Sequence, residues 1–251
     1  ELTIKTTALT IAIIALYYQD LTLVFTDALT NEATSYILII PFIFTYLIYR
    51  KRKMLTATAT NTPQNQTHKN TRYYTIPIGI LLCTIATITY WHGSYTFTPL
   101  EYHLATLPIF TAGLTLILFN IQTLKQALFP IAFLTFLMPP PNEIFYNIGA
   151  ALSVTSSEAS TAIVQACRIP ATLTGEYGTP TILVTRPDLT TIQFTVDIAC
   201  SGIYSLIGFL VFATFIAYIA RDKPWKKAEI FLIGLPLIYL LNLTRILTIV
   251  A

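Results

Sequence analysis

Residues 197–227 read DIACSGIYSLIGFLVFATFIAYIARDKPWKK, and they decide how the rest of the chain is interpreted. An apolar stretch begins at Cys200 and runs to Ala220, and a basic segment from Arg221 to Lys227 follows it. A transmembrane helix needs about 20 mainly apolar residues. The stretch therefore predicts a membrane span with a cysteine, a serine and a glycine at its amino-terminal end.

The composition of the whole chain supports a membrane protein. Of its 251 residues, 54% are hydrophobic and 11% are charged, whereas a soluble domain carries about 25% charged residues. We expect an all-α polytopic membrane protein, with residues 1–251 forming a single domain. The chain opens on Glu1 and stops inside an apolar run, which predicts a domain incomplete at its carboxyl end. About seven spans are predicted, at residues 6–24, 35–49, 73–90, 102–120, 124–138, 200–220 and 228–251.

The basic residues predict the orientation of these spans. Cytoplasmic loops carry an excess of Lys and Arg. With the amino terminus in the cytoplasm, 12 of the 15 basic residues lie inside, and only Arg168, Arg186 and Arg245 lie outside. Residues 50–72 then form a cytoplasmic loop. We expect a multi-pass protein of the plasma membrane in which Cys200 lies on the extracytoplasmic face.

Residues 142–197 form the longest external segment. Apolar residues recur at helical spacing over its first half, which predicts an interfacial or re-entrant amphipathic helix. Its second half has β-branched and aromatic runs on both sides of Arg186, Pro187 and Asp188. This pattern predicts a short β-hairpin that leads directly to Cys200.

A count of residues between the charged ends places Cys200 and Arg245 at the same depth. Arg221 lies 21 residues after Cys200, and Arg245 lies 19 residues after Lys226. At about 1.5 Å per residue, each distance is close to one hydrocarbon thickness of about 30 Å. A helix amino terminus and a nearby guanidinium both favour an anion, so the thiolate of Cys200 is a candidate nucleophile.

Other residues near these two complete the candidate site. Ser201 and Gly202 leave room for a substrate backbone, Tyr204 lies one turn further on, and Asn242 shares a helix face with Arg245. His92 and His103 are external and are candidate bases. No cysteine or histidine spacing typical of a metal site is present, and no metal or cofactor is expected.

Each of these residues also has a structural alternative. Cys200 can be a small residue that starts a helix, and Arg245 can extend its side chain to the lipid headgroups. Both histidines can be structural. A disulfide between Cys167 and Cys200 remains open.

Two motifs together carry a resemblance to a known family. ACSGIYSL at residues 199–206 and PLIYLLNLTRI at 236–246, with FLMPPP at 136–141, resemble the exosortase/archaeosortase family of membrane transpeptidases. The likeness covers residues 129–251 well and the first half loosely, and the Thr- and Ile-rich composition suggests an archaeal branch.

The resemblance implies a cysteine peptidase that cleaves C-terminal sorting signals of secreted precursor proteins. Such a signal has an apolar helix and a basic tail, and the new carboxyl terminus passes to an acceptor, thought to be a lipid. Cys200 matches the nucleophile of the family and Arg245 its essential arginine. A third essential residue, His or Arg, is expected after Ala251. No nucleic-acid partner is expected. A membrane scaffold or a transporter are the alternative functions.

Overall fold

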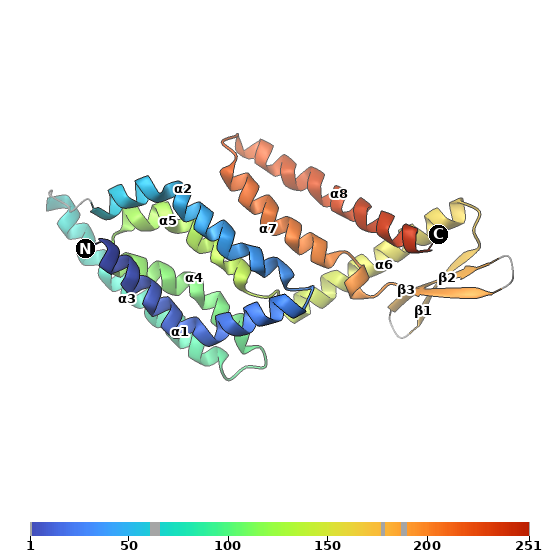
Figure 1. Ribbon diagram of the computed structural model, residues 1–251, viewed down its shortest axis with the longest axis horizontal. Coiled ribbons are helices and arrows are strands. Elements are labelled where there is room, and N and C mark those ends of the chain that lie inside the picture. The colour runs from blue at the N-terminus through green and yellow to red at the C-terminus, as the bar shows by residue number, and fades with distance from the viewer. Residues whose placement is uncertain (1, 61–65, 177–178, 187–189, 251) are drawn as a thin grey trace. The chain divides into compact units, whose positions relative to one another are not determined.

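The computed structural model describes residues 2–60, 66–176, 179–186 and 190–250. The chain divides into two compact units, residues 1–139 and 140–251, and each is described by itself. Figure 1 shows helices throughout both units and one small sheet in the second.

The first unit is a helical bundle. Its helices are α1 Leu2–Thr30, α2 Ile40–Thr60, α3 Gln66–Gly93, α4 Pro99–Leu118 and α5 Ile121–Phe133, with short 3-10 helices at Ser35–Ile39 and Leu134–Leu137. Helices α3 and α4 approach each other closely, because a Cβ on Gly79 would lie 2.9 Å from the carbonyl oxygen of Gly113 and a Cβ on Gly113 would lie 2.9 Å from that of Gly79. Small residues allow such contact in membrane bundles.

The second unit combines helices with a three-stranded antiparallel sheet. Its elements are α6 Asn142–Ala166, β1 Ala171–Glu176, β2 Thr179–Thr185, β3 Thr191–Thr195, a 3-10 turn Ile198–Cys200 (η3), α7 Ile203–Ile219 and α8 Pro224–Val250. The strands lie in the order β1-β2-β3. The sheet, α6 and the end of α8 enclose an apolar core of Val164, Ala171, Ile182, Val184, Val196, Ile246 and Val250.

The predicted hairpin is confirmed and extended. Strands β2 and β3 pair antiparallel with Thr185 opposite Thr191, on either side of the turn expected at Arg186, Pro187 and Asp188. Residues 187–189 themselves lie outside the described residues. Strand β1 was not predicted, because the alternation of Ala171, Thr172, Leu173 and Thr174 spans only four residues before Gly175.

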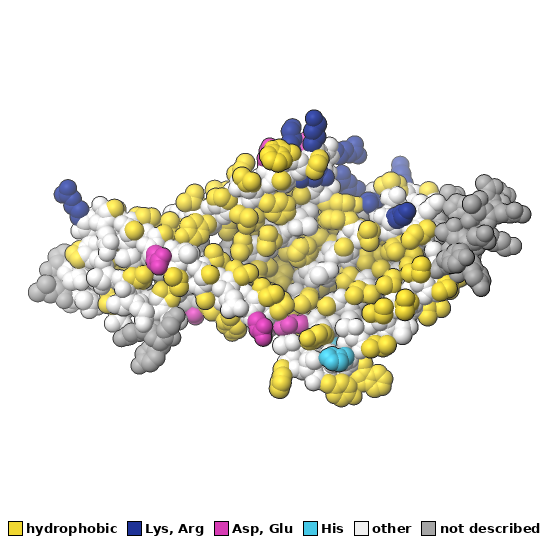
Figure 2. Space-filling view, turned by 180° about the vertical axis from the view of Figure 1, so that it is seen from behind, with side chains coloured by type: hydrophobic (Ala, Val, Ile, Leu, Met, Phe, Trp, Pro, Cys, Tyr) yellow, Lys and Arg dark blue, Asp and Glu magenta, His cyan; other side chains and the backbone are white. Residues whose placement is uncertain are grey.

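The all-α membrane class is confirmed, but the expected number of spans was too high. Within the described part of the chain, four helical segments are long and apolar enough to cross a membrane: Leu2–Thr30, Thr75–Gly93, Pro99–Leu118 and Pro224–Val250. A fifth is reached only if Ile121–Leu137 and Asn142–Ala166 count as one broken span. Helix α2 contains four consecutive basic residues, and α7 has only 17 residues. Figure 2 shows hydrophobic side chains spread over one face of the molecule.

Residues 50–72 and helix α6 were each expected to have a particular structure. The stretch 50–72, expected to be a cytoplasmic loop, is helical over 50–60 in α2 and over 66–72 in α3, while residues 61–65 lie outside the described part. Helix α6 covers much of the predicted amphipathic helix. Its serine-rich face, including Ser153, Ser156 and Ser157, is buried, and apolar residues such as Ile148 and Val154 are exposed.

Candidate active site

Cys200 lies in a tight turn between the sheet and α7. Asp197 begins this turn, since its side-chain Oδ1 accepts a hydrogen bond from the backbone N–H of Ile198 at 2.6 Å. The N–H of Cys200 then donates to the carbonyl of Asp197 at 2.9 Å. Helix α7 begins only at Ile203, so Cys200 precedes the helix instead of starting it as predicted.

Ser201 and Gly202 make the connection between this turn and α7. Ser201 is buried, and its hydroxyl donates to the carbonyl of Ile198 at 2.6 Å. Gly202 has φ +89°, in the left-handed region that favours glycine. These two residues therefore shape the backbone around Cys200.

Asn242 holds the Cys200 turn from α8. Its side-chain amide donates to the carbonyl oxygens of Cys200, at 3.3 Å, and of Ser201, at 2.9 Å. A Cβ on Gly202 would lie 2.7 Å from Cγ of Asn242, so this contact requires glycine at position 202. Each such bond stabilises the arrangement by about 1 kcal/mol. We call Gly202 and Asn242, with the two carbonyls, the amide clamp.

A second contact between α7 and α8 joins Phe209 and Gly234. A Cβ on Gly234 would lie 2.1 Å from Cζ of Phe209, so the Phe209 ring packs directly on the backbone of α8 at Gly234. This contact and the clamp are separated by seven residues on α7 and by eight on α8. Two antiparallel helices in contact at matching intervals bring the carboxyl end of α8 alongside the Cys200 turn.

Helix α6 supports the same turn from its other side. Gly149 lies against Ile198, since a Cβ at position 149 would lie 2.6 Å from Cγ2 of Ile198. The hydroxyl of Ser153 donates to the carbonyl of Val196. The segment that leads to Cys200 is thus attached to α6, and the residues that follow it are attached to α8.

The Cys200 side chain is half-buried and packs against the apolar core of the second unit, which includes Ile246. All three cysteines of the chain are free, so Cys200 and Cys167 form no disulfide. The first-turn N–H groups of α7 point toward its amino-terminal end, which favours negative charge near Cys200.

Arg245 lies one helical turn beyond Asn242 and directly before Ile246. Its side chain is exposed, and among the described residues it has no hydrogen-bond or ion-pair partner. At 1.5 Å per residue, it lies about 4.5 Å further along the α8 axis than Asn242. Arg245 therefore lies one turn beyond the residue of α8 that contacts the Cys200 turn. Tyr204 stacks on Phe145 with ring centroids 5.8 Å apart.

The two histidines lie in the first unit, where their surroundings differ. His92 is exposed in the last turn of α3, with its ring edge toward Tyr102 at 6.3 Å. His103 is buried, and both of its ring nitrogens have partners: Nδ1 lies 2.7 Å from Oδ1 of Asp20, and Nε2 lies 3.0 Å from Oγ of Ser94.

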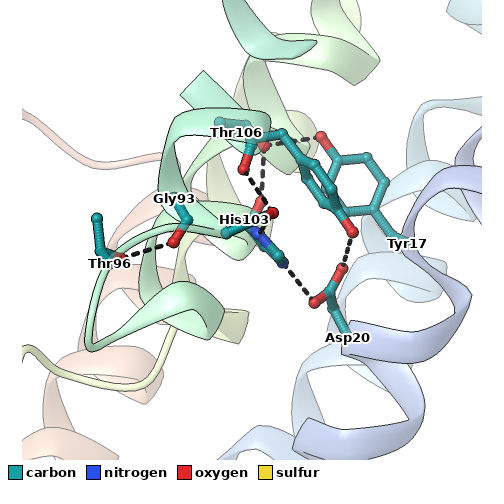
Figure 3. A network of polar contacts seen from close by, with 8 residues as sticks. Tyr17, Asp20, Gly93, Thr96, His103 and Thr106 are labelled. Atoms are coloured by element: carbon teal, nitrogen blue, oxygen red, sulfur yellow. Dashed lines mark hydrogen bonds and ion pairs between the residues drawn. The ribbon is translucent and has the colours of Figure 1, made fainter. Parts of the chain in front are cut away.

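The sequence interpretation missed the network around His103. Figure 3 shows Asp20 between the His103 ring and the hydroxyl of a tyrosine. That hydroxyl belongs to Tyr90, which donates to Oδ2 of Asp20 at 2.8 Å. An acidic residue inside an apolar span usually has a buried partner or a function. Asp20 interrupts the first predicted span and carried this signal.

Metal binding has no evident basis in the described side chains. Among the side chains that the structure describes, in residues 2–59, 75–175, 179–186 and 190–250, no group of three or more His, Cys, Asp or Glu could hold a metal ion. The Cys200 turn has a half-buried thiol and a backbone held by Asn242, and the same helix α8 carries the exposed Arg245.

One of three comparisons with known proteins gives a match. No curated protein and no solved structure matches the chain. The model of one protein family, described as transmembrane exosortase, matches residues 28–251. The matched range contains the Cys200 turn and the whole of α8. The chain therefore belongs to the transmembrane exosortase family, a family of membrane cysteine transpeptidases.

Proposed function

We propose that this chain is the membrane cysteine transpeptidase that cleaves C-terminal sorting signals of secreted precursor proteins and passes the new carboxyl terminus to a lipid acceptor. The observation that carries this proposal is the amide clamp. It holds the backbone of Cys200 from α8, on the helix that also bears Arg245 one turn further on. Family membership supports a sorting function of this kind.

The proposed reaction uses Cys200 as its nucleophile. The thiolate Sγ attacks the scissile carbonyl carbon, the C–N bond breaks, and the leaving amine takes up a proton from water. The precursor remains attached to Cys200 as a thioester. A hydroxyl or amine of the acceptor then attacks the thioester and gives up a proton to water, the C–S bond breaks, and the thiolate is restored. Arg245 stabilises the thiolate or the negative oxygen of each tetrahedral intermediate.

The membrane setting suits the proposed substrate. The outward face of α8 is apolar, since the side chains of Leu232 and Leu240 are exposed there. A sorting signal with an apolar helix is therefore confined to the same membrane plane as this enzyme. A basic tail on the substrate favours the cytoplasmic side. The cleaved bond then lies near the extracytoplasmic face, where the charge distribution is expected to place Cys200.

Alkylation of the wild-type protein tests this function against a non-enzymatic scaffold. Membrane vesicles holding the full-length protein are treated with iodoacetamide and then given a tagged precursor with a sorting signal. We expect cleavage to stop as Cys200 becomes alkylated, which peptide mass spectrometry follows. A Cys167→Ala variant is the control, since Cys167 is exposed and reacts as well. Cleavage at the untreated rate with Cys200 fully alkylated would contradict the proposal.

Gly202→Ala is expected to lower the cleavage rate by about 100-fold, because displacement of a reacting group by about 1 Å has an effect of this size. The new Cβ overlaps Asn242, and the left-handed backbone costs alanine about 1–2 kcal/mol. Gly208→Ala within α7 is the matched control, since no atom beyond its chain neighbours and the nearby helix backbone lies within 4 Å of its new Cβ. Cleavage assays and thermal melts of both variants measure the effect. Equal rates for Gly202→Ala and Gly208→Ala would show that the clamp does not position Cys200.

A further inference from the structure

Three residues of the first unit form a chain of contacts that the Cys200 chemistry does not use. Asp20 comes from α1, Ser94 from the turn after α3, and His103 from the first turns of α4. Oδ1 of Asp20 lies 2.7 Å from Nδ1 of His103, and Nε2 of His103 lies 3.0 Å from Oγ of Ser94. A carboxylate, an imidazole and a hydroxyl in this order can move a proton from the hydroxyl to the ring.

The His103 ring contacts Tyr90 through its face and Asp20 through its edge. Tyr90 stacks on the His103 ring with centroids 3.8 Å apart and planes 15° apart, and its hydroxyl donates to the second carboxylate oxygen of Asp20 at 2.8 Å. Asp20 and His103 are each only 8% exposed. A buried carboxylate requires hydrogen bonds to both oxygens. The two oxygens of Asp20 have such partners in His103 and Tyr90. Asp20 therefore favours the tautomer with a proton on Nδ1, which leaves the lone pair of Nε2 facing Ser94.

Ser94 differs from its two partners because it is exposed. Its hydroxyl lies closer to Nε2 of His103, at 3.0 Å, than to the carbonyl of Tyr90, at 3.3 Å. A small reagent or substrate can thus reach a hydroxyl whose proton acceptor is buried and fixed.

We propose that Ser94, His103 and Asp20 form a second reactive site, independent of Cys200, in which Ser94 accepts an acyl group from an ester. Oγ of Ser94 attacks the ester carbonyl carbon while its proton passes to Nε2 of His103. The bond to the alcohol then breaks, the alcohol leaves with that proton, and Ser94 carries the acyl group as an ester.

The surroundings of Ser94 indicate which esters fit and how fast the site works. Trp91, Tyr95 and Phe97 are 65%, 80% and 107% exposed, and such aromatic residues gather where a membrane meets water. An ester of an amphiphile held at that interface is the substrate class.

The N–H groups of Ser94, Tyr95 and Thr96 already donate to carbonyls of α3. Because these donors are engaged, acylation is expected to be slow.

A fluorophosphonate probe tests this site in the full-length protein. We expect the probe to label Ser94 about 100-fold faster than Ser35, because a positioned base contributes about this much. Ser35 is an exposed serine of the same unit whose hydroxyl donates only to the carbonyl of Glu32. His103→Gln and Asp20→Asn should remove most of this advantage, whereas Cys200→Ala should leave it intact, which separates this site from the proposed transpeptidase function. Peptide mass spectrometry locates and counts the label.

A second comparison avoids any change to the buried residues. In Ser94→Cys the neighbouring imidazole should favour a thiolate, so iodoacetamide should alkylate position 94 about tenfold faster than it alkylates Ser35→Cys. Either advantage, in the probe or in the alkylation rate, supports the site. Labelling of Ser94 no faster than Ser35, together with equal alkylation of the two cysteine variants, would overturn it and leave the network a purely structural link between α1, α3 and α4.

Discussion

Cys200→Ala is expected to abolish cleavage of a sorting-signal precursor, and Cys200→Ser is expected to reduce it by at least about 1,000-fold. A serine hydroxyl remains protonated near pH 7, whereas a few per cent of an ordinary cysteine is already thiolate. The described surroundings of Cys200 also contain no base in hydrogen-bond contact that could activate a serine. Cleavage of a tagged precursor in membrane vesicles, followed by gel shift, measures both variants.

The control for this prediction is chosen from the same unit. Cys167 is free and exposed just after α6, and Cys167→Ala should cleave at the wild-type rate. The Cys200 variants should also keep the wild-type melting temperature to within a few degrees, since the backbone of Cys200, and not its side chain, makes the bonds to Asn242 and Asp197. A wild-type rate in both Cys200→Ala and Cys200→Ser would remove the basis of the proposed mechanism.

Arg245→Gln is expected to lower the cleavage rate by about 100- to 1,000-fold, the usual effect of removing one group that stabilises an oxyanion. Arg245→Lys separates this role from a lipid anchor. Lysine can extend its charge to the headgroups as arginine does, but it lacks the planar pair of donors. We therefore expect Arg245→Lys to remain well below the wild-type rate, by about tenfold or more.

Arg221→Gln is the matched control for Arg245. Arg221 is likewise exposed, but it follows the carboxyl end of α7, at the opposite end of the α7–α8 pair from the Cys200 turn. Its loss should leave the cleavage rate nearly unchanged. If Arg245→Lys cleaves at the wild-type rate, the side chain acts as an anchor and takes no part in the reaction.

The sequence predicted the membrane class and the family, since apolar runs and two short motifs are local features. It also predicted the hairpin, because β-branched runs flank Arg186, Pro187 and Asp188. The number of spans was wrong because apolar length alone does not show where helices end. Helix α7 begins only at Ile203 and ends at Ile219, so it is shorter than the usual length of a membrane span.

The details of the Cys200 turn could not be predicted, because they depend on contacts between distant segments. Asn242 was expected to line the site, yet its amide bonds to backbone carbonyls 41 and 42 residues away. Ser201 was expected to leave room for substrate, yet it is buried and bonds to Ile198. The left-handed backbone of Gly202 was the one detail with a local signal, since glycine adopts a positive φ more readily than other residues.

The inward side of α6 and the partners of His103 were missed for a related reason. In water a serine-rich face is expected to be exposed, but in a membrane the apolar face meets lipid and small polar residues pack inside. Asp20 and His103 are 83 residues apart in the chain, so only the fold brings them together. The unusual presence of a carboxylate in an apolar span was the available signal.

The most direct test of the account is to look for the precursor attached to Cys200. The full-length protein is mixed with a tagged precursor in detergent without lipid acceptor and quenched in acid, and its cysteine peptides are analysed by mass spectrometry. If Cys200 is the nucleophile, the Cys200 peptide carries the precursor fragment as a thioester, hydroxylamine releases it, and Arg245→Gln lowers the rate at which it forms. Cleaved precursor that accumulates with no thioester on Cys200 at any time would contradict the account.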